Sequence, residues 1–166
     1  MNSLFIKVGL LTATLTLSAC ASLAPPSRPA YSGTDSVTSA EPSQLVGSWQ
    51  VTELNPYPDA EPQNTIIEYA ADGTVRGEVI PSGKSAAVLG EDTRFEFLGT
   101  WSLTADRVVH QDIQMSTTGS NAMAGLMAKM VNRRQNVAGS ANIYELTDNR
   151  IVMVGDEGNA MEYVRQ

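Results

Sequence analysis

The sequence predicts a mainly β domain in which an antiparallel up-and-down meander closes into a barrel or a half-barrel. From Leu45 onward, short runs of β-favouring residues follow one another at a spacing of roughly ten residues. Turn signals such as Asp72-Gly73 and Asp148-Asn149 separate the runs. No helical pattern alternates with them, which disfavours a parallel α/β sheet. Closing the meander on itself would cover the edges of its outer strands.

Residues 1–19 have the layout of a secretory signal peptide. Lys7 places a positive charge in the leading segment, an apolar stretch runs from Val8 to Leu17, and small residues come next. The apolar stretch is about ten residues long, whereas a membrane-spanning helix needs about 20. We therefore expect export and cleavage, not a stop-transfer helix.

The four residues Leu17-Ser18-Ala19-Cys20 resemble the lipobox of bacterial lipoproteins. The resemblance implies a diacylglyceryl group on the Cys20 thiol, cleavage before the cysteine, and acylation of the new amino group by a chain such as palmitate. Two or three chains make a durable membrane anchor, because each buried methylene contributes about 0.8 kcal/mol. Ala21, in place of Asp, resembles the signal for an outer-membrane anchor facing the periplasm. An ordinary secretory peptide with an incidental cysteine is the alternative.

The chain after Cys20 is predicted to be a flexible tether up to residue 43. Residues 21–43 are rich in Pro, Ser, Thr and Ala, and as a coil they would reach roughly 25 Å on average. The folded domain then comprises residues 44–166. The whole chain carries 18 acidic residues against 11 basic ones. This acidity argues against binding nucleic acid and against electrostatic adhesion to anionic lipid, so the lipid itself must hold the protein on the membrane.

Nine strands are predicted in the domain, each a β-favouring run bounded by turn residues. They span residues 46–54, 64–70, 73–80, 93–98, 99–104, 107–114, 139–146, 149–155 and 159–165. The segment 55–62 is too rich in proline for a central strand, and we expect it to form a long first loop.

Residues 120–134 break the strand pattern and predict a short inserted helix. Ser120 or Asn121 can cap its start. One face carries an apolar stripe of Met123, Leu126, Met127, Met130 and Val131. Three interpretations stay open. The helix packs on the barrel as a core cap, it is a mobile lid over an apolar pocket, or it is a docking surface for the membrane or a partner protein.

The domain resembles the lipocalin-like (calycin) barrels of bacteria. The resemblance implies that Trp49 plugs one end of the barrel, and that Arg165 packs over it in a cation–π contact of about 0.5–2 kcal/mol. It also implies that the loop 55–62 lies at the open mouth. The motifs that carry it are Leu45-Val46-Gly47-Ser48-Trp49, Glu68-Tyr69, Asp72-Gly73-Thr74-Val75, Gly99-Thr100-Trp101-Ser102-Leu103, Tyr144–Leu146 and Tyr163-Val164-Arg165.

Little in the sequence supports an enzyme. His110 is the only histidine, so a metal site or a catalytic assembly would lack a second one. Asp112 lies two residues on and could share a strand face with His110. No Gly-x-Ser-x-Gly elbow, phosphate-binding glycine loop or metal-ligand spacing accompanies the pair. We expect a non-enzymatic protein without cofactor or metal, in which His110 faces solvent or makes a hydrogen bond.

The expected function is therefore binding. The first hypothesis is a membrane-anchored envelope lipoprotein that holds a small apolar ligand, a lipid or a fatty acyl group, in a barrel pocket. Its candidate lid consists of Met123, Leu126, Met127 and Met130. The alternative is a structural or protein-interaction lipoprotein of the envelope, with a barrel filled by its own side chains and an envelope protein as partner.

Overall fold

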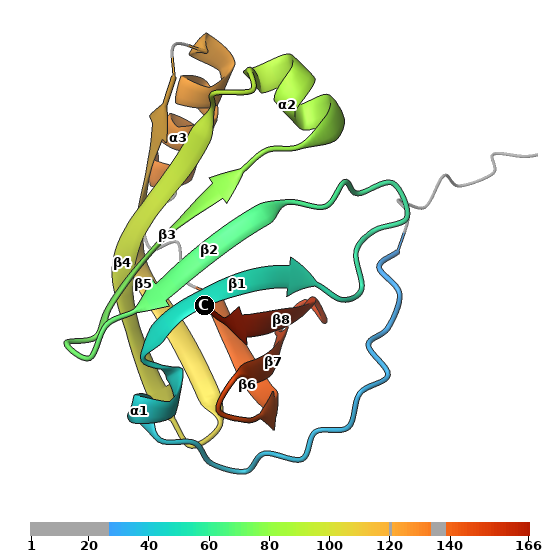
Figure 1. The fold of residues 1–166 in the computed structure, drawn as a ribbon, viewed down its shortest axis with the longest axis vertical. Helices are drawn as coiled ribbons and strands as arrows, with labels where there is room; N and C mark the ends of the chain where they lie inside the picture. The colour runs from blue at the N-terminus through green and yellow to red at the C-terminus, as the bar shows by residue number, and fades with distance from the viewer. Residues whose placement is uncertain (1–26, 120, 134–138) are drawn as a thin grey trace, which may run out of the picture.

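The computed structural model describes residues 27–119, 121–133 and 139–166, which contain one closed barrel of eight antiparallel strands (Figure 1). Each strand pairs with its neighbours in the chain, and β8 closes the barrel against β1. The predicted meander that closes into a barrel is therefore confirmed. The strands are β1 (Gly47–Glu53), β2 (Asn64–Tyr69), β3 (Thr74–Ile80), β4 (Arg94–Thr104), β5 (Arg107–Thr118), β6 (Gly139–Leu146), β7 (Arg150–Gly155) and β8 (Ala160–Arg165).

β4 merges two of the nine predicted strands, 93–98 and 99–104. Gly99 is the first residue of the second of these predicted strands. In the structure its lack of a side chain serves a close approach of β5. A Cβ atom at Gly99 would lie 2.7 Å from the Gln111 carbonyl oxygen and 2.5 Å from the Ile113 side chain. The chain therefore continues through Gly99 without turning.

A β-bulge in β5 changes which of its side chains face the barrel interior. Between Gln111 and Gln114, β5 has one residue more than the facing part of β4, and Asp112 adopts a positive φ of 55°. Before the bulge, the even-numbered residues of β5 point inward, as the buried Val108 does. After it, the odd-numbered residues do so, beginning with Ile113, which packs against the core.

One end of the barrel is closed by the core and by the short helix α1 (Pro42–Leu45). Leu45 and Trp49 are both 0% exposed, and Trp49 Nε1 donates a hydrogen bond of 2.7 Å to the Leu45 carbonyl. Trp101, Ile143 and other buried side chains of the strands continue this cluster. The core therefore occupies the half of the barrel next to α1.

Two further helices, α2 (Gly83–Leu89) and α3 (Ala122–Arg133), lie at the opposite end (Figure 1). α3 is the inserted helix that the sequence predicts, whereas α2 was not predicted. Leu89 of α2 and Ala124 of α3 pack with Phe95 in a second buried cluster. Asn121 caps α3, accepting hydrogen bonds from the amides of Met123 and Ala124 at 2.9 and 3.2 Å. None of the helices in the described ranges is long and apolar enough to cross a membrane.

α3 also covers an edge of β5. Within the described residues, β5 pairs with β6 only from Arg107 to His110, and no strand of that part of the chain pairs with the later residues of β5 on that side. The side-chain amide of Asn132 takes this place at Met115. It accepts a hydrogen bond from the Met115 amide and donates one to the Met115 carbonyl, both 2.7 Å long. The helix thus blocks further strand pairing at this edge.

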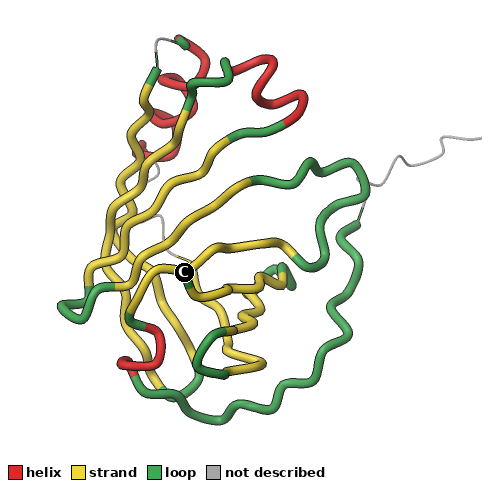
Figure 2. The backbone as a smooth tube through the Cα atoms, in the orientation of Figure 1, coloured by secondary structure: helices red, strands yellow, loops and turns green. Residues whose placement is uncertain are grey.

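Residues 27–41, which the sequence assigns to a flexible tether, lie along the outside of the barrel (Figure 2). We name this segment the N-terminal strap. Its amides at Ser36 and Ala40 donate hydrogen bonds of 3.2 and 3.0 Å to the carbonyls of Tyr144 and Ala105. The segment is bound to the barrel and is not the free tether that the sequence predicts. A local sequence pattern could not show this, because the partners of these hydrogen bonds are barrel residues far away in the sequence.

Candidate functional site

The end of the barrel opposite Trp49 is its mouth. The rim consists of the β1–β2 loop at residues 54–63, the helices α2 and α3, and the β7–β8 turn at residues 156–159 (Figure 1). The β1–β2 loop contains the Pro-rich segment that the resemblance to lipocalin-like barrels places at the mouth. Two cavities reach the interior from this rim.

The first, which we call the lumen cavity, has a volume of about 480 Å³. This lies in the range of small-molecule sites, about 300–1,000 Å³. Its inner wall is mainly apolar, and its polar groups are His110 and a rim of residues from β6 and the β7–β8 turn. The inner wall consists of Ile67, Ala141, Met153, Met161 and Tyr163.

His110 forms the polar base of the lumen cavity, and it is held by Tyr69, which is fully buried and is not part of the cavity lining. The Tyr69 hydroxyl and His110 Nε2 are 2.9 Å apart, and the two rings stack with centroids separated by 5.7 Å. Burial lowers the pKa of His110, so its ring is neutral at pH 7. Burial likewise raises the pKa values of Tyr69 and Tyr163. His110 and Tyr163, which line the cavity, therefore offer neutral hydrogen-bonding groups.

The structure does not bring Asp112 to His110. The two residues would share a face on a regular strand, but the bulge between Gln111 and Gln114 separates them. Asp112 is exposed, whereas His110 makes its hydrogen bond to Tyr69. Within the described ranges, no three His, Cys, Asp or Glu side chains gather as metal ligands.

A polar network lies at the rim of the lumen cavity. Arg107 Nη2 donates to both carboxylate oxygens of Asp156, at 2.8 and 2.9 Å, and Nη1 donates to Asn142 at 2.9 Å. The Ser140 hydroxyl also donates to Asp156. The hydrogen bond from Ser140, followed by that from Arg107, lowers the pKa of Asp156. The network fixes the β7–β8 turn beside the entrance.

A second cavity of about 540 Å³ lies between the β1–β2 loop and α2. It shares Met161 with the lumen cavity, so this side chain stands between the two. A larger hollow of about 700 Å³ lies on the outer face of β2–β5, over the exposed ion pair of Arg76 and Glu68. Its lining also includes Glu78 and Glu96, and it lies outside the barrel interior. The lumen cavity is therefore the candidate site.

The four candidate lid residues do not line either cavity at the mouth. Met123 and Met130 are 53% exposed, Leu126 50% and Met127 44%. Ala124 and Ala128, on the other face of α3, are buried instead. The helix therefore packs through its small residues, which permit a close approach to the barrel, and it turns the larger apolar ones outward.

The structure places Arg165 over Trp49 at the closed end. The guanidinium carbon lies 4.1 Å from the Trp49 ring centroid, which is the contact that the resemblance implies. The same guanidinium donates hydrogen bonds to three backbone carbonyls, those of Gln44, Val46 and Asp148, at 3.0, 2.9 and 2.6 Å. The remaining predicted site residue, Cys20, lies outside the described residues.

Sequence reasoning missed the pairing of His110 with Tyr69 and the contribution of Met161 and Tyr163 to the cavity wall. These residues come from β5, β2 and β8. The usable signal was the alternation of side chains along each strand, which indicates shared faces but not which strands lie across the barrel.

No protein-family model matches the chain, and no curated protein matches it in sequence. Seven chains among the solved structures are similar to it, and these include the following two. The crystal structure of an uncharacterized protein from Bacteroides eggerthii is 16% identical with a TM-score of 0.44, over 74% of this chain and 99% of that one. The NMR structure of a protein from Burkholderia xenovorans is 11% identical with a TM-score of 0.38, over 83% of this chain and 98% of that one. Both likenesses are too weak to bear on function.

Proposed function

We propose that the protein is a lipoprotein of the cell envelope, anchored by lipid on Cys20, that binds a small apolar ligand in its lipocalin-like barrel. The ligand class is a lipid or a fatty acyl group. The lumen cavity carries the proposal, because it combines an apolar wall with a volume of about 480 Å³. The proposal involves neither catalysis nor a cofactor.

The polar base of the cavity supports a defined orientation of the ligand. His110 and Tyr163 line the cavity, are neutral and can hydrogen-bond a hydroxyl, ester or protonated carboxyl group. An acyl chain would then lie along Met153 and Met161, whose flexible side chains adapt to chains of different shape.

Native mass spectrometry of a Cys20→Ser form, exported with an ordinary signal peptide and purified without detergent, tests the proposal. We expect a reproducible adduct of lipid mass that is lost on denaturation. Ala141→Phe, which places a large side chain in the lumen cavity, should abolish the adduct. Thr104→Phe adds the same bulk at an exposed position near the closed end and should leave the adduct unchanged.

Folding of each variant is checked by circular dichroism. Overpacking costs about 1–3 kcal/mol, and if Ala141→Phe does not fold, Gly139→Leu serves as the second variant. Gly139 also lines the cavity, and a Cβ atom there meets nothing within 4 Å. An adduct that persists in folded Ala141→Phe and Gly139→Leu would place the ligand elsewhere and contradict the proposal.

A filled barrel that binds an envelope protein is the second candidate. The buried cluster around Trp49 and Trp101 favours it, because these side chains already fill the half of the barrel next to α1. A clean mass without adduct, under conditions that preserve weak complexes, would favour this candidate.

A further inference from the structure

The N-terminal strap begins at the mouth of the barrel. Arg28 forms an ion pair with Glu53, donates a hydrogen bond of 3.1 Å to the Asn55 carbonyl, and lies 4.5 Å over the Tyr57 ring. The Asn55 side chain in turn donates to the Pro29 carbonyl at 2.8 Å. These contacts hold the first described residues of the chain against the β1–β2 loop.

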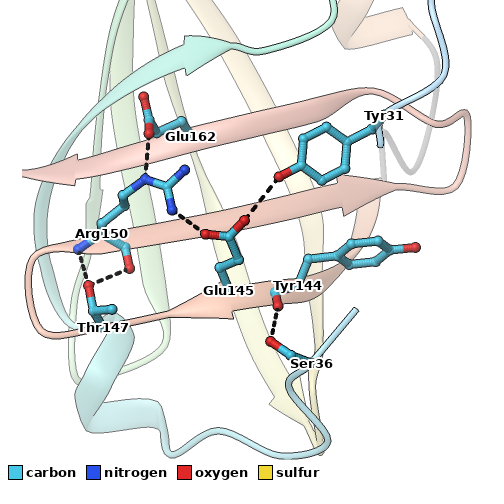
Figure 3. Close-up of polar contacts among 7 residues, drawn as sticks. All are labelled: Tyr31, Ser36, Tyr144, Glu145, Thr147, Arg150 and Glu162. Carbon is cyan, nitrogen blue, oxygen red and sulfur yellow. Dashed lines mark hydrogen bonds and ion pairs between the residues drawn. The ribbon is translucent and has the colours of Figure 1, made fainter. Parts of the chain in front are cut away.

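From the mouth, the strap runs along the outside of the barrel toward the closed end. The Tyr31 hydroxyl donates to Glu145 at 3.2 Å, and Glu145 pairs with Arg150, which also binds Glu162 at 2.5 Å (Figure 3). Tyr31 is thus joined to a network that crosses β6, β7 and β8.

Further along, the Ser36 hydroxyl donates to the Tyr144 carbonyl at 2.9 Å (Figure 3). The strap then reaches Ala105, at the turn between β4 and β5, and leads into α1. It therefore spans the barrel from the mouth to the closed end.

Because the strap follows this path, a lipid anchor on Cys20 would hold the mouth of the barrel, and not the closed end, near a membrane. Residue 27 lies at the mouth, and seven peptide units separate it from Cys20. At about 3.3–3.6 Å per residue, they reach at most about 25 Å. Without the strap, the anchor would be joined to the barrel at α1, at the closed end.

α3 and the start of the strap both lie at the rim of the mouth, on different sides of it (Figure 1). Hydrogen bonds connect the rim from one to the other. The Ser85 amide donates to Glu61 of the β1–β2 loop at 3.2 Å, and Asn121 before α3 donates to the Val88 carbonyl of α2, also at 3.2 Å. The rim is therefore one connected structure, with the strap on one side and α3 on another (Figure 1).

The outward face of α3 has the composition of a helix that rests at a membrane interface. We name its four large apolar residues, Met123, Leu126, Met127 and Met130, the α3 stripe. Val88 of α2, 68% exposed, adds to this apolar surface. Lys129 and Arg133 are also exposed on α3 and suit the level of lipid headgroups. Glu91 and Asp92, in the turn after α2, oppose attraction to anionic lipid, so apolar contact must supply the binding.

We propose that the mouth of the barrel rests on the lipid bilayer, with the α3 stripe inserted at the interface. This inference rests on the proposed anchoring at Cys20. The lipid anchor and the α3 stripe act as two attachments to the same surface, and the strap fixes the orientation between them. An apolar ligand could then pass between the bilayer and the lumen cavity without crossing open water.

Depth-dependent fluorescence quenching on the full lipidated protein tests the orientation. Because Cys20 is blocked by lipid, Met127→Cys provides a single free thiol for an environment-sensitive dye, and Thr104→Cys provides the matched probe near the closed end. The proteins are reconstituted in phosphatidylcholine vesicles that contain brominated acyl chains. We expect quenching at position 127 to be several-fold stronger than at position 104, and to persist at high salt.

A variant of the strap tests whether the strap sets the orientation of the barrel. Arg28→Gln combined with Tyr31→Phe removes the ion pair with Glu53 and the hydrogen bond to Glu145. Lipidation should stay unchanged, whereas the difference in quenching between the two probes should become smaller, because the first residues of the strap are then held less firmly to the barrel.

The outcomes separate the orientation from the anchoring. If the mass of the mature protein shows lipid on Cys20 but the two probes are quenched equally, anchoring stands and the orientation is overturned. The α3 stripe would then be a surface for a protein partner. If the mature chain carries no lipid, both the anchoring and the orientation are overturned.

Discussion

Arg165 stabilises the closed end through an arrangement that only a planar guanidinium can make. It lies over Trp49 and donates to three backbone carbonyls in different segments. A lysine would keep the positive charge but could not match this fork. The residue, which belongs to β8, therefore connects this strand to α1, to the residue before β1 and to the β6–β7 turn.

We expect Arg165→Ala to lower the free energy of unfolding by about 2–3 kcal/mol, because hydrogen bonds from a charged group and the cation–π contact are lost together. Arg165→Lys should recover only part of this loss. Arg76→Ala is the control, since its exposed ion pair with Glu68 contributes about 0–1 kcal/mol. Urea unfolding followed by tryptophan fluorescence measures all three, and equal stabilities for Arg165→Ala and Arg76→Ala would refute this role.

His110 should make stability depend on pH in a defined window. Burial lowers its pKa in the folded state, so below about pH 6.5 the unfolded chain binds a proton that the folded one resists. Stability is therefore lost as the pH falls from 7 through that value, with a slope of at most about 1.4 kcal/mol per pH unit.

His110→Gln should flatten the curve between pH 7 and the lower pKa of the folded state. The carboxyl groups of Glu145 and Asp156 have lowered pKa values, so their contribution is lost only in a more acidic range. Chemical unfolding at a series of pH values checks this, and identical slopes in the wild type and the variant above pH 5 would exclude His110 as the cause.

Among the elements, α3 has two faces with different roles. Ala124 and Ala128 are buried, and the large apolar residues face outward. Asn132, near the end of the helix, hydrogen-bonds the backbone of β5 in place of a strand partner. The helix therefore belongs to the barrel and is not a separate appendage.

Replacing Asn132 with Leu should remove both hydrogen bonds to the Met115 backbone. We expect a loss of about 1 kcal/mol in unfolding free energy and faster hydrogen exchange at the Met115 amide. Lys129→Gln, an exposed change on the same helix, should alter neither quantity. Unchanged exchange at Met115 in Asn132→Leu would mean that the edge is protected by packing alone.

At the scale of the whole molecule, the barrel has two unlike ends. One is filled by the core and covered by α1 and Arg165, whereas the other holds two cavities and the helices α2 and α3. The strap links the ends on the outside. Stability is thus concentrated at one end and the space for a ligand at the other, which makes the proposed membrane-facing mouth compatible with a firmly folded barrel.

The antiparallel barrel and the inserted helix could be predicted from the sequence, because strand alternation, turn residues and helix periodicity are local properties. The contact of Arg165 with Trp49 was implied only by the resemblance to lipocalin-like barrels. The apolar stripe on α3 was also visible, but not its direction. Whether methionines or alanines face the barrel depends on how closely the helix can approach β5, and that distance is set by residues elsewhere in the chain.

Three features are seen only in the tertiary structure. Tyr69 lies beside His110, Asp112 lies away from it, and the strap binds along the barrel. Each of these depends on a register or on contacts between residues far apart in sequence. A single-residue bulge reverses the faces of a strand, and a Pro-rich segment has no pattern of its own that reveals a surface to which it binds. Local sequence therefore determined the elements, and long-range packing decided which of their side chains form the site.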